Sequence, residues 1–246
     1  MKNHISLFIF AIALLSGPVS ANDLSMTAVK DTLASIPGEH NYIYVRTPLG
    51  EDEEKNYDEI TFYDGLGREL DFAQSYGADR AGAIMAHHHL IEYDSLGRKE
   101  KQWLSTNTSF SYMSPEDLKG GVLWDYHDAG KRSYLQTNYE SSPLNRITEQ
   151  YGVGDAWGDH PARMEYLTNI PADSLRCSFY FIDDNDSLIR RGDYRSGELQ
   201  VTKATDEDGK PTYTFVDKQG RTLLTRLGRG NQQADTYFVF DRFGRI

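Results

Sequence analysis

The sequence lacks several features that define common classes of protein. It has a single cysteine, Cys177, so no intrachain disulfide can form. Its 26 Lys and Arg are outnumbered by 37 Asp and Glu, and the formal net charge of −11 opposes binding to nucleic acid or an anionic membrane. No P-loop, zinc-protease or nucleophile-elbow motif occurs. We therefore assign no catalytic residue and expect no cofactor.

The first 21 residues have the pattern of a secretory signal peptide. Lys2 is positive, residues 5–15 are apolar, and Val19-Ser20-Ala21 is a small-x-small cleavage pattern. We expect cleavage after Ala21 and a periplasmic, cell-surface or secreted location. No later apolar run is long enough for a transmembrane segment.

Aromatic residues are abundant, with 16 Tyr and 11 Phe, and they occur in short runs separated by Gly, Asn, Asp and Pro. This pattern favours strands. Only Ser114-Pro115-Glu116-Asp117 resembles a helix start, and Gly120-Gly121 is expected to end that helix at once, near 114–119. We therefore expect an all-β fold of antiparallel hairpins forming a curved or spiralling sheet.

A repeated turn motif is the strongest signal in the sequence. Each copy has an aromatic residue or Val, then Asp, two variable residues, Gly and Arg. The Asp can accept hydrogen bonds from the turn backbone, and the Gly tolerates positive φ. An exposed Asp–Arg pair contributes only about 0–1 kcal/mol, so turn geometry is expected to dominate. The predicted structural turn residues are Asp64, Gly67, Arg68, Asp94, Gly97, Arg98, Asp217, Gly220, Arg221, Asp241, Gly244 and Arg245.

These turns resemble the YD repeat of the Rhs and teneurin-like families. The blocks 41–48, 156–169 and 197–222 also resemble the domain of unknown function at the head of secreted bacterial Rhs repeat proteins. The resemblance implies a β-sheet shell around a C-terminal toxin or effector, with the remaining Rhs core or effector as partner. The family's self-cleaving aspartate site has no counterpart, so we interpret the chain as partial or truncated.

The expected organisation has four parts: a signal peptide (1–21), a flexible segment or short helix (22–40), a β domain with two repeats (41–170), and further hairpins, incomplete at the C-terminus (171–246). The leading hypothesis is an exported structural protein, part of an Rhs-type shell and not an enzyme. The alternative is a cell-surface module that binds glycans or proteins through its aromatic residues. A hydrolase ranks last.

Three features are weak candidates for chemistry. His87, His88 and His89 alternate between strand faces, so at most two could share a metal. Asp206 and Asp208, like the loop 183–187, offer oxygen ligands suited to calcium, although turn chemistry explains both loops better. Cys177 lies in a strand-like run and is interpreted as a buried, inert thiol.

Overall fold

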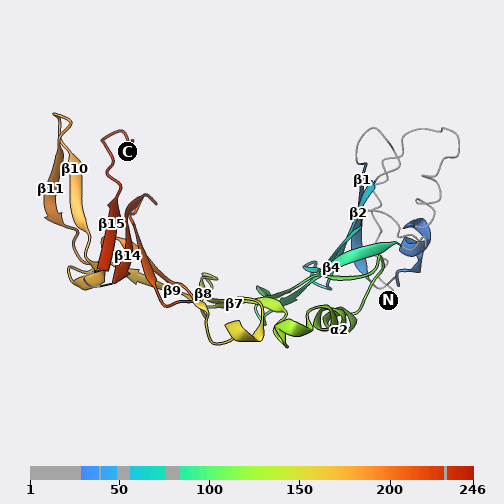
Figure 1. Ribbon diagram of the computed structural model, residues 1–246. Helices are drawn as coiled ribbons and strands as arrows, with labels where there is room; N and C mark the ends of the chain where they lie inside the picture. The colour runs from blue at the N-terminus through green and yellow to red at the C-terminus, as the bar shows by residue number, and fades with distance from the viewer. Residues whose placement is uncertain (1–28, 39, 49–55, 76–83, 230–231) are drawn as a thin grey trace. The chain divides into compact units, whose positions relative to one another are not determined.

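The computed structural model describes residues 29–38, 40–48, 56–75, 84–229 and 232–246 (Figure 1). The predicted signal peptide lies outside these residues. Antiparallel strands are the commonest regular structure in the described chain, and helices are few and short, so the predicted all-β class is confirmed. Within the described residues, no helix combines the length and the apolar character needed to cross a membrane.

The first of two compact units comprises the described residues up to Leu135 together with Val153–Asp155. Its strands follow the hydrogen-bonded order β1-β2-β3-β4-β5, and β6 pairs with β4. These pairs are all antiparallel, and apart from β4 with β6 they join strands that follow one another in the chain. The strands are β1 (Asn41–Pro48), β2 (Asn56–Tyr63), β3 (Glu69–Ser75), β4 (Met85–Tyr93), β5 (Lys99–Trp103) and β6 (Thr106–Ser109).

The second unit comprises Gln136–Gly152 and Ala156–Ile246. Its strands follow the order β8-β9-β12-β13-β14-β15, and β7 lies between β5 and β8 in the hydrogen-bond order. Two further strands, β10 and β11, pair only with each other among the described residues. The strands are β7 (Tyr134–Tyr139), β8 (Ile147–Tyr151), β9 (Ala162–Thr168), β10 (Ser178–Ile182), β11 (Leu188–Asp193), β12 (Gln200–Thr205), β13 (Pro211–Val216), β14 (Thr222–Arg229) and β15 (Gln232–Tyr237).

Each unit has its own hydrophobic core, built from strand side chains together with a few residues of the connections. Alternation places every second side chain on the same face, so β3 buries Asp71, Ala73 and Ser75 in turn. In the first unit the core contains Ile36, Ile60, Phe62, Ala73, Ala86 and Phe110. In the second it contains Cys177, Leu199, Val201, Tyr213, Phe215, Leu223 and Leu224.

The first unit contains two helices, one within the segment 22–40, where a short helix was one of the expectations, and one that is longer than the sequence predicts. Residues 29–35 are helical, and Ile36 directly after them belongs to the core. Helix α2 spans Pro115–Asp125 and does not end at the expected position near 119. Buried Leu118 and Val122 hold it against the sheet, and this burial outweighs the roughly 1 kcal/mol that each interior Gly costs a helix. Gly121 also allows close approach, because a Cβ there would lie 2.7 Å from Thr106 Oγ1.

Short 3₁₀ helices complete the connections between strands. They are η1 (His127–Ala129), η2 (Asp155–Trp157) and η3 (Asp173–Leu175). The fold is therefore a succession of hairpins, and the connections at the hairpin ends carry the repeated turn motif.

Candidate functional site

The repeated turn has a specific hydrogen-bond geometry, seen first at Asp64–Arg68. The amide of Gly67 donates to the Asp64 carbonyl at 3.0 Å, and the amide of Asp64 donates to the Arg68 carbonyl at 2.9 Å. The Asp64 side chain accepts from the amides of Leu66 and Arg68 through Oδ1 and faces Arg68 Nε at 2.7 Å through Oδ2. Gly67 has φ of 77°, a left-handed conformation that L side chains rarely adopt.

The other three predicted turns have the same pattern of contacts. Their Asp Oδ1 atoms each accept two backbone hydrogen bonds of 2.8–2.9 Å, and their Asp Oδ2 atoms face the Arg Nε at 2.7–2.8 Å. The structure thus places the Asp, Gly and Arg of each copy in one local unit, at Asp94–Arg98, Asp217–Arg221 and Asp241–Arg245.

Each of these carboxylates is held in its charged form. For Asp64, Asp94 and Asp217, burial alone would raise the pKa. Hydrogen bonds from the backbone and guanidinium of the turn Arg together lower the pKa by more than burial raises it, so the pKa of each carboxyl lies below its usual value. For Asp241 the backbone amide of Arg245 is the largest cause of a lowered pKa. The turn carboxylates are therefore saturated by their own turns and are poorly placed for proton transfer or metal binding.

The strand that follows a turn carries one extra residue. Phe62 pairs with Asp71 while Tyr63 pairs with Glu69, so Leu70 bulges out of the ladder. The same bulge, in which the second strand has one residue more than the first, occurs between β4 and β5 and between β13 and β14. Bulges of this kind increase local strand twist. The motif therefore specifies a twist as well as a change of direction.

Successive turns in one unit contact each other through arginine and an aromatic ring. The guanidinium of Arg68 lies 4.4 Å from the ring centre of Tyr93, whose hydroxyl donates to the Glu69 carbonyl at 2.7 Å. In the second unit Arg221 lies 4.9 Å from the ring centre of Phe240. The Arg of one turn thus supports the aromatic residue that begins the next turn, a cation–π contact worth about 0.5–1 kcal/mol at exposed sites.

A third example of this contact comes from a turn that the sequence analysis missed. The amide of Glu140 donates to the Arg146 carbonyl at 2.9 Å, and Arg146 Nη2 pairs with Glu140 Oε2 at 2.7 Å. Arg146 lies 4.5 Å from the ring centre of Tyr166, whose hydroxyl donates to the Ile147 carbonyl. Asn145 supplies the positive φ in place of Gly, and Asn tolerates this conformation better than most residues. The longer loop and the Glu conceal the motif in the sequence.

A further copy is divided by an inserted hairpin. Buried Asn169 takes the role of the turn Asp: its Oδ1 accepts from the amide of Leu199 at 2.8 Å. Its carbonyl accepts from the amide of Gly197, which has φ of 77°. Between the two halves lie β10 and β11, joined by the turn Asp183–Ser187, where Asp186 has positive φ. The insertion hides this copy because its two halves are almost 30 residues apart in the sequence.

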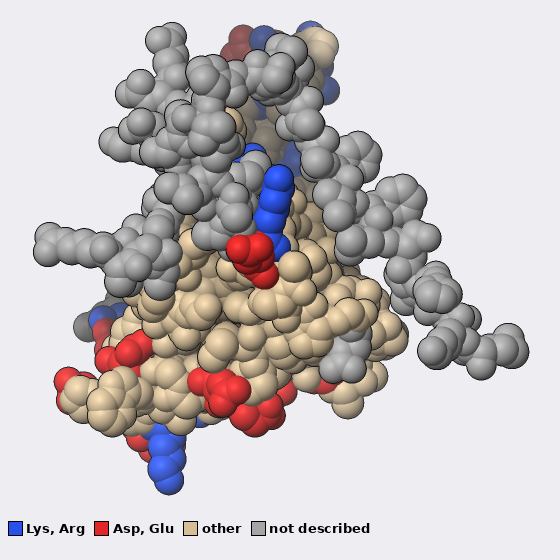
Figure 2. Space-filling view, turned by 90° about the vertical axis from the view of Figure 1, so that its right-hand side faces the viewer, with Lys and Arg blue, Asp and Glu red and all other residues tan. Residues whose placement is uncertain are grey.

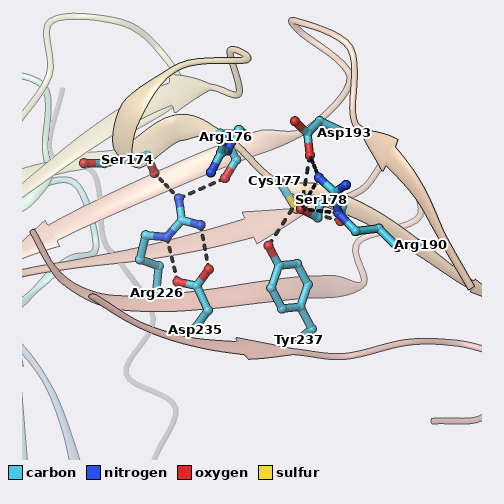
Figure 3. A network of polar contacts seen from close by, with 9 residues as sticks. All are labelled: Ser174, Arg176, Cys177, Ser178, Arg190, Asp193, Arg226, Asp235 and Tyr237. Carbon is cyan, nitrogen blue, oxygen red and sulfur yellow. Dashed lines mark hydrogen bonds and ion pairs between the residues drawn. The ribbon is translucent and has the colours of Figure 1, made fainter. Parts of the chain in front are cut away.

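Arg226 fixes the inserted segment to the sheet (Figure 3). Its guanidinium forms a bidentate pair with Asp235, 2.7 Å for each hydrogen bond, and Nη1 donates to the carbonyls of Ser174 and Arg176 at 2.8 and 2.9 Å. The phenol oxygen of Tyr237 accepts from the amide of Ser178 at 3.2 Å. A single buried Arg therefore links β14, β15 and the chain that leads into β10.

An aromatic pocket lies beside this contact in the second unit. Its volume is ≈ 120 Å³. Its lining includes Ser178–Phe181 of β10 and Tyr237–Phe240, at and after the end of β15. Tyr194, Arg221 and Leu223 complete the lining. Arg221 and Phe240 belong to the third and fourth predicted turns, so the pocket is built partly from the repeat itself.

The three consecutive histidines lie on β4 in different environments. His88 is buried, with Nδ1 2.6 Å from Asp71 Oδ2 and Nε2 2.9 Å from the Ser109 carbonyl. Both of its ring nitrogens are therefore occupied by protein atoms. His87 is exposed, and burial lowers the pKa of half-buried His89. The structure does not bring the three imidazoles together as ligands.

The acidic loops are turns of the same type. Asp206 Oδ1 accepts from the amides of Asp208 and Lys210 at 3.1 and 2.7 Å, and Asp208 pairs with the Lys210 ammonium. Asp183 Oδ1 likewise accepts two backbone hydrogen bonds. Among the described residues, no group of three or more His, Cys, Asp or Glu side chains is arranged to hold a metal ion.

Cys177 lies in the core of the second unit with an exposed fraction of 1%. Burial raises the pKa of its thiol to about 12, so the nucleophilic thiolate is scarce near neutral pH.

The acidic charge does not form one patch on the face that Figure 2 shows. There Asp and Glu occur in small groups, and uncharged side chains cover most of the described surface. Many carboxylates are paired within their own turns, as the four turn aspartates are. On this face the acidic side chains are thus dispersed.

Comparison with known proteins gives one match. A family model described as "Domain of unknown function (DUF6443)" matches residues 41–168, slightly more than half of the chain. The match begins at β1 and ends with β9. No curated protein and no solved structure is significantly similar to the chain.

Proposed function

Because the chain belongs to the DUF6443 family, whose members share a domain without an assigned activity, we propose a structural function for it. It is an exported building block of an Rhs-type YD-repeat shell, the N-terminal part of a wall that encloses or presents an effector. Its partners are the remaining shell strands or the effector domain. In this proposal the protein binds and encloses but catalyses no reaction.

The observation that carries the proposal is the contact between successive turns. In Arg68 over Tyr93 and Arg221 over Phe240, the Arg of one turn packs on the aromatic residue directly before the next turn, and Arg146 packs in the same way on Tyr166 of the next strand, β9. A contact that repeats from turn to turn lets a sheet grow by adding hairpins of the same kind. This property suits a wall, whereas a catalytic site requires a few residues that differ from the repeat.

The reading frame downstream of the codon for Ile246 tests the shell proposal. We expect it to continue into further hairpins with the order aromatic, Asp, two variable residues, Gly and Arg, followed by a variable C-terminal region. A natural stop codon directly after Ile246, with no neighbouring gene encoding such repeats, would contradict the proposal. Sequencing of the genomic locus and of the transcript distinguishes the two outcomes.

Export is the second part of the proposal. The signal-peptide pattern of residues 1–21 supports it. Expression with the native N-terminus, cell fractionation and N-terminal sequencing of the mature chain should find it outside the cytoplasm and beginning at Asn22. Recovery of the full chain from the cytoplasm, with residues 1–21 still attached, would oppose export.

The aromatic pocket favours a second candidate function, a surface module that binds glycans or proteins. Phe179, Tyr180 and Tyr237 offer ring faces beside polar groups such as Ser178, the combination that sugar and peptide sites use. A glycan array probed with the purified protein tests the sugar form. Binding that is lost in a Tyr180→Ala variant and retained in Trp124→Ala would support it, and an array without signal would remove it.

A further inference from the structure

The end of β15 combines an open strand edge with the aromatic pocket. Within the described residues β15 pairs with β14 alone, so its other edge has no strand partner. Proteins commonly protect such edges with Lys, Pro or a bulge. The sequence of β15, Gln-Gln-Ala-Asp-Thr-Tyr, has neither Lys nor Pro, and its one charge, Asp235, is bound to Arg226. This edge is therefore suited to receiving a strand.

The pocket is the right size for a side chain. Its ≈ 120 Å³ is well below the roughly 300–1,000 Å³ typical of small-molecule sites. Four consecutive residues, Tyr237–Phe240, line it, so it runs along the backbone at the end of β15. A strand added here can therefore pair with that backbone while one of its side chains enters the pocket, the arrangement called β-augmentation.

The repeat itself indicates the chemistry of the incoming strand. After the turn Asp217–Arg221 the chain continues as β14, and Leu223 and Leu224 are buried directly after the turn. Leu223 also lines the pocket. The turn Asp241–Arg245 has the same hydrogen bonds. A strand beside β15 in the register that β14 has beside β13 brings its own leucines to the pocket.

We propose that the open edge of β15 and the aromatic pocket form a docking site for an extended polypeptide strand with the sequence pattern of β14. The strand pairs with β15 through backbone hydrogen bonds and places an apolar side chain against Phe179 and Phe238. The inference rests on the shell function proposed above and identifies the surface at which further wall is added.

A labelled peptide with the sequence of Gln219–Arg229 is the probe. Its binding to the full-length protein is measured by fluorescence anisotropy. We expect saturable binding that weakens at least about tenfold, or 1.4 kcal/mol, in a Phe179→Ala variant. A peptide carrying Asp at the positions of Leu223 and Leu224 should not bind, because the pocket would have to desolvate a charge. Trp124→Ala, an exposed aromatic substitution on α2, is the matched control and should bind as the wild type does.

Several results would overturn the inference. One is a wild-type protein that does not bind the peptide, and another is equal binding by the Phe179→Ala and wild-type proteins when both have native circular dichroism and melting temperature. A homodimer that Phe179→Ala dissociates, without peptide binding, would show that a second copy occupies the site instead. These outcomes are separate from the genomic test, because the downstream frame can encode further repeats whether or not this edge binds a free strand.

Discussion

At the residue scale, the turn aspartate and the turn glycine serve the backbone. Asp94 Oδ1 accepts hydrogen bonds from two amides inside the tight turn, and Gly97 has φ of 81°. Arg98 completes the turn with a pair to Asp94 at 2.7 Å. These roles are local, so the sequence pattern alone predicts them.

Two alanine substitutions separate the positive φ that glycine allows from the space that it leaves for Arg68. Gly67→Ala should destabilise the first unit by about 1–2 kcal/mol, because an L residue is strained at φ of 77°. Gly97→Ala should cost more, because its Cβ would also lie 3.0 Å from Arg68 Nη1 and disturb the contact of Arg68 with Tyr93. Urea unfolding followed by circular dichroism measures both.

Gly65→Ala is the control for these variants. Gly65 has no positive φ and no atom within 4 Å of an added Cβ, so little change is expected. Equal losses in Gly67→Ala and Gly97→Ala would show that the contact between Arg68 and Tyr93 adds no stability.

Cys177 should be inert in the folded protein. Burial raises its pKa to about 12, so iodoacetamide at pH 8 should leave the native chain unlabelled and label it fully in urea. Mass spectrometry of the intact protein measures the added mass. Rapid labelling of the native chain would mean that the second unit opens at this position.

The lowered pKa values of the turn aspartates predict a loss of stability in acid. A carboxyl whose folded pKa lies below its unfolded value of about 3.9 stabilises the folded state above that pH, and this contribution is lost as the pH falls through the folded pKa. The melting temperature should therefore fall below about pH 4.

Asp94→Asn provides the comparison for this prediction. The amide oxygen can still accept the two backbone hydrogen bonds, but the side chain cannot ionise in this pH range. The variant should be less stable than the wild type at pH 7 and should lose less stability on acidification. Parallel melting curves for the two proteins would contradict the assignment of the acid effect to this turn.

At the element scale, the hairpin β10–β11 depends on the sheet beneath it. A two-stranded hairpin is at best marginally stable alone in water. Arg226 supplies four hydrogen bonds to Asp235, Ser174 and Arg176, and Tyr180 packs edge-on against Tyr237 at 4.9 Å. The inserted hairpin is thus held by contacts far away in the sequence, which no local pattern predicts.

Replacing Arg226 should release this hairpin. Arg226→Ala leaves a partly buried carboxylate and two carbonyls without their donor, which should cost about 3 kcal/mol. Hydrogen–deuterium exchange should accelerate most in Ser178–Asp193. Arg190→Ala, which removes an exposed pair with Asp193, is the control and should change exchange little. Uniform acceleration across the second unit would mean that Arg226 stabilises the unit and not the hairpin in particular.

At the scale of the whole molecule, the two units and the family match divide the chain differently. The contacts separate it near Leu135, whereas the DUF6443 match runs from 41 to 168 and includes strands of both units. Among the described residues, the hydrogen-bond order runs from β1 through β7 to β15, with β6 beside β4 and with β10 and β11 apart from it. The family match therefore follows the series of hairpins and coincides with neither unit.

Metal ions should not stabilise the molecule. The Asp183 and Asp206 carboxylates accept hydrogen bonds in their own turns, and both ring nitrogens of His88 have protein partners. Calcium, zinc and a chelator should each leave the melting temperature unchanged, measured by differential scanning fluorimetry. A rise with zinc that disappears in His87→Ala would show a site that the described residues do not display.

The sequence by itself determined the strand content and the four turns with Gly and Arg, because turn geometry depends on residues only four positions apart. It also indicated the start of helix α2 through the capping Ser114, but not its end. Only the tertiary structure decided where α2 stops, that Asn169 and Gly197 close one turn around an insertion, and that Arg226 holds that insertion. Each depends on burial or on partners distant in the sequence, and such contacts override local propensity.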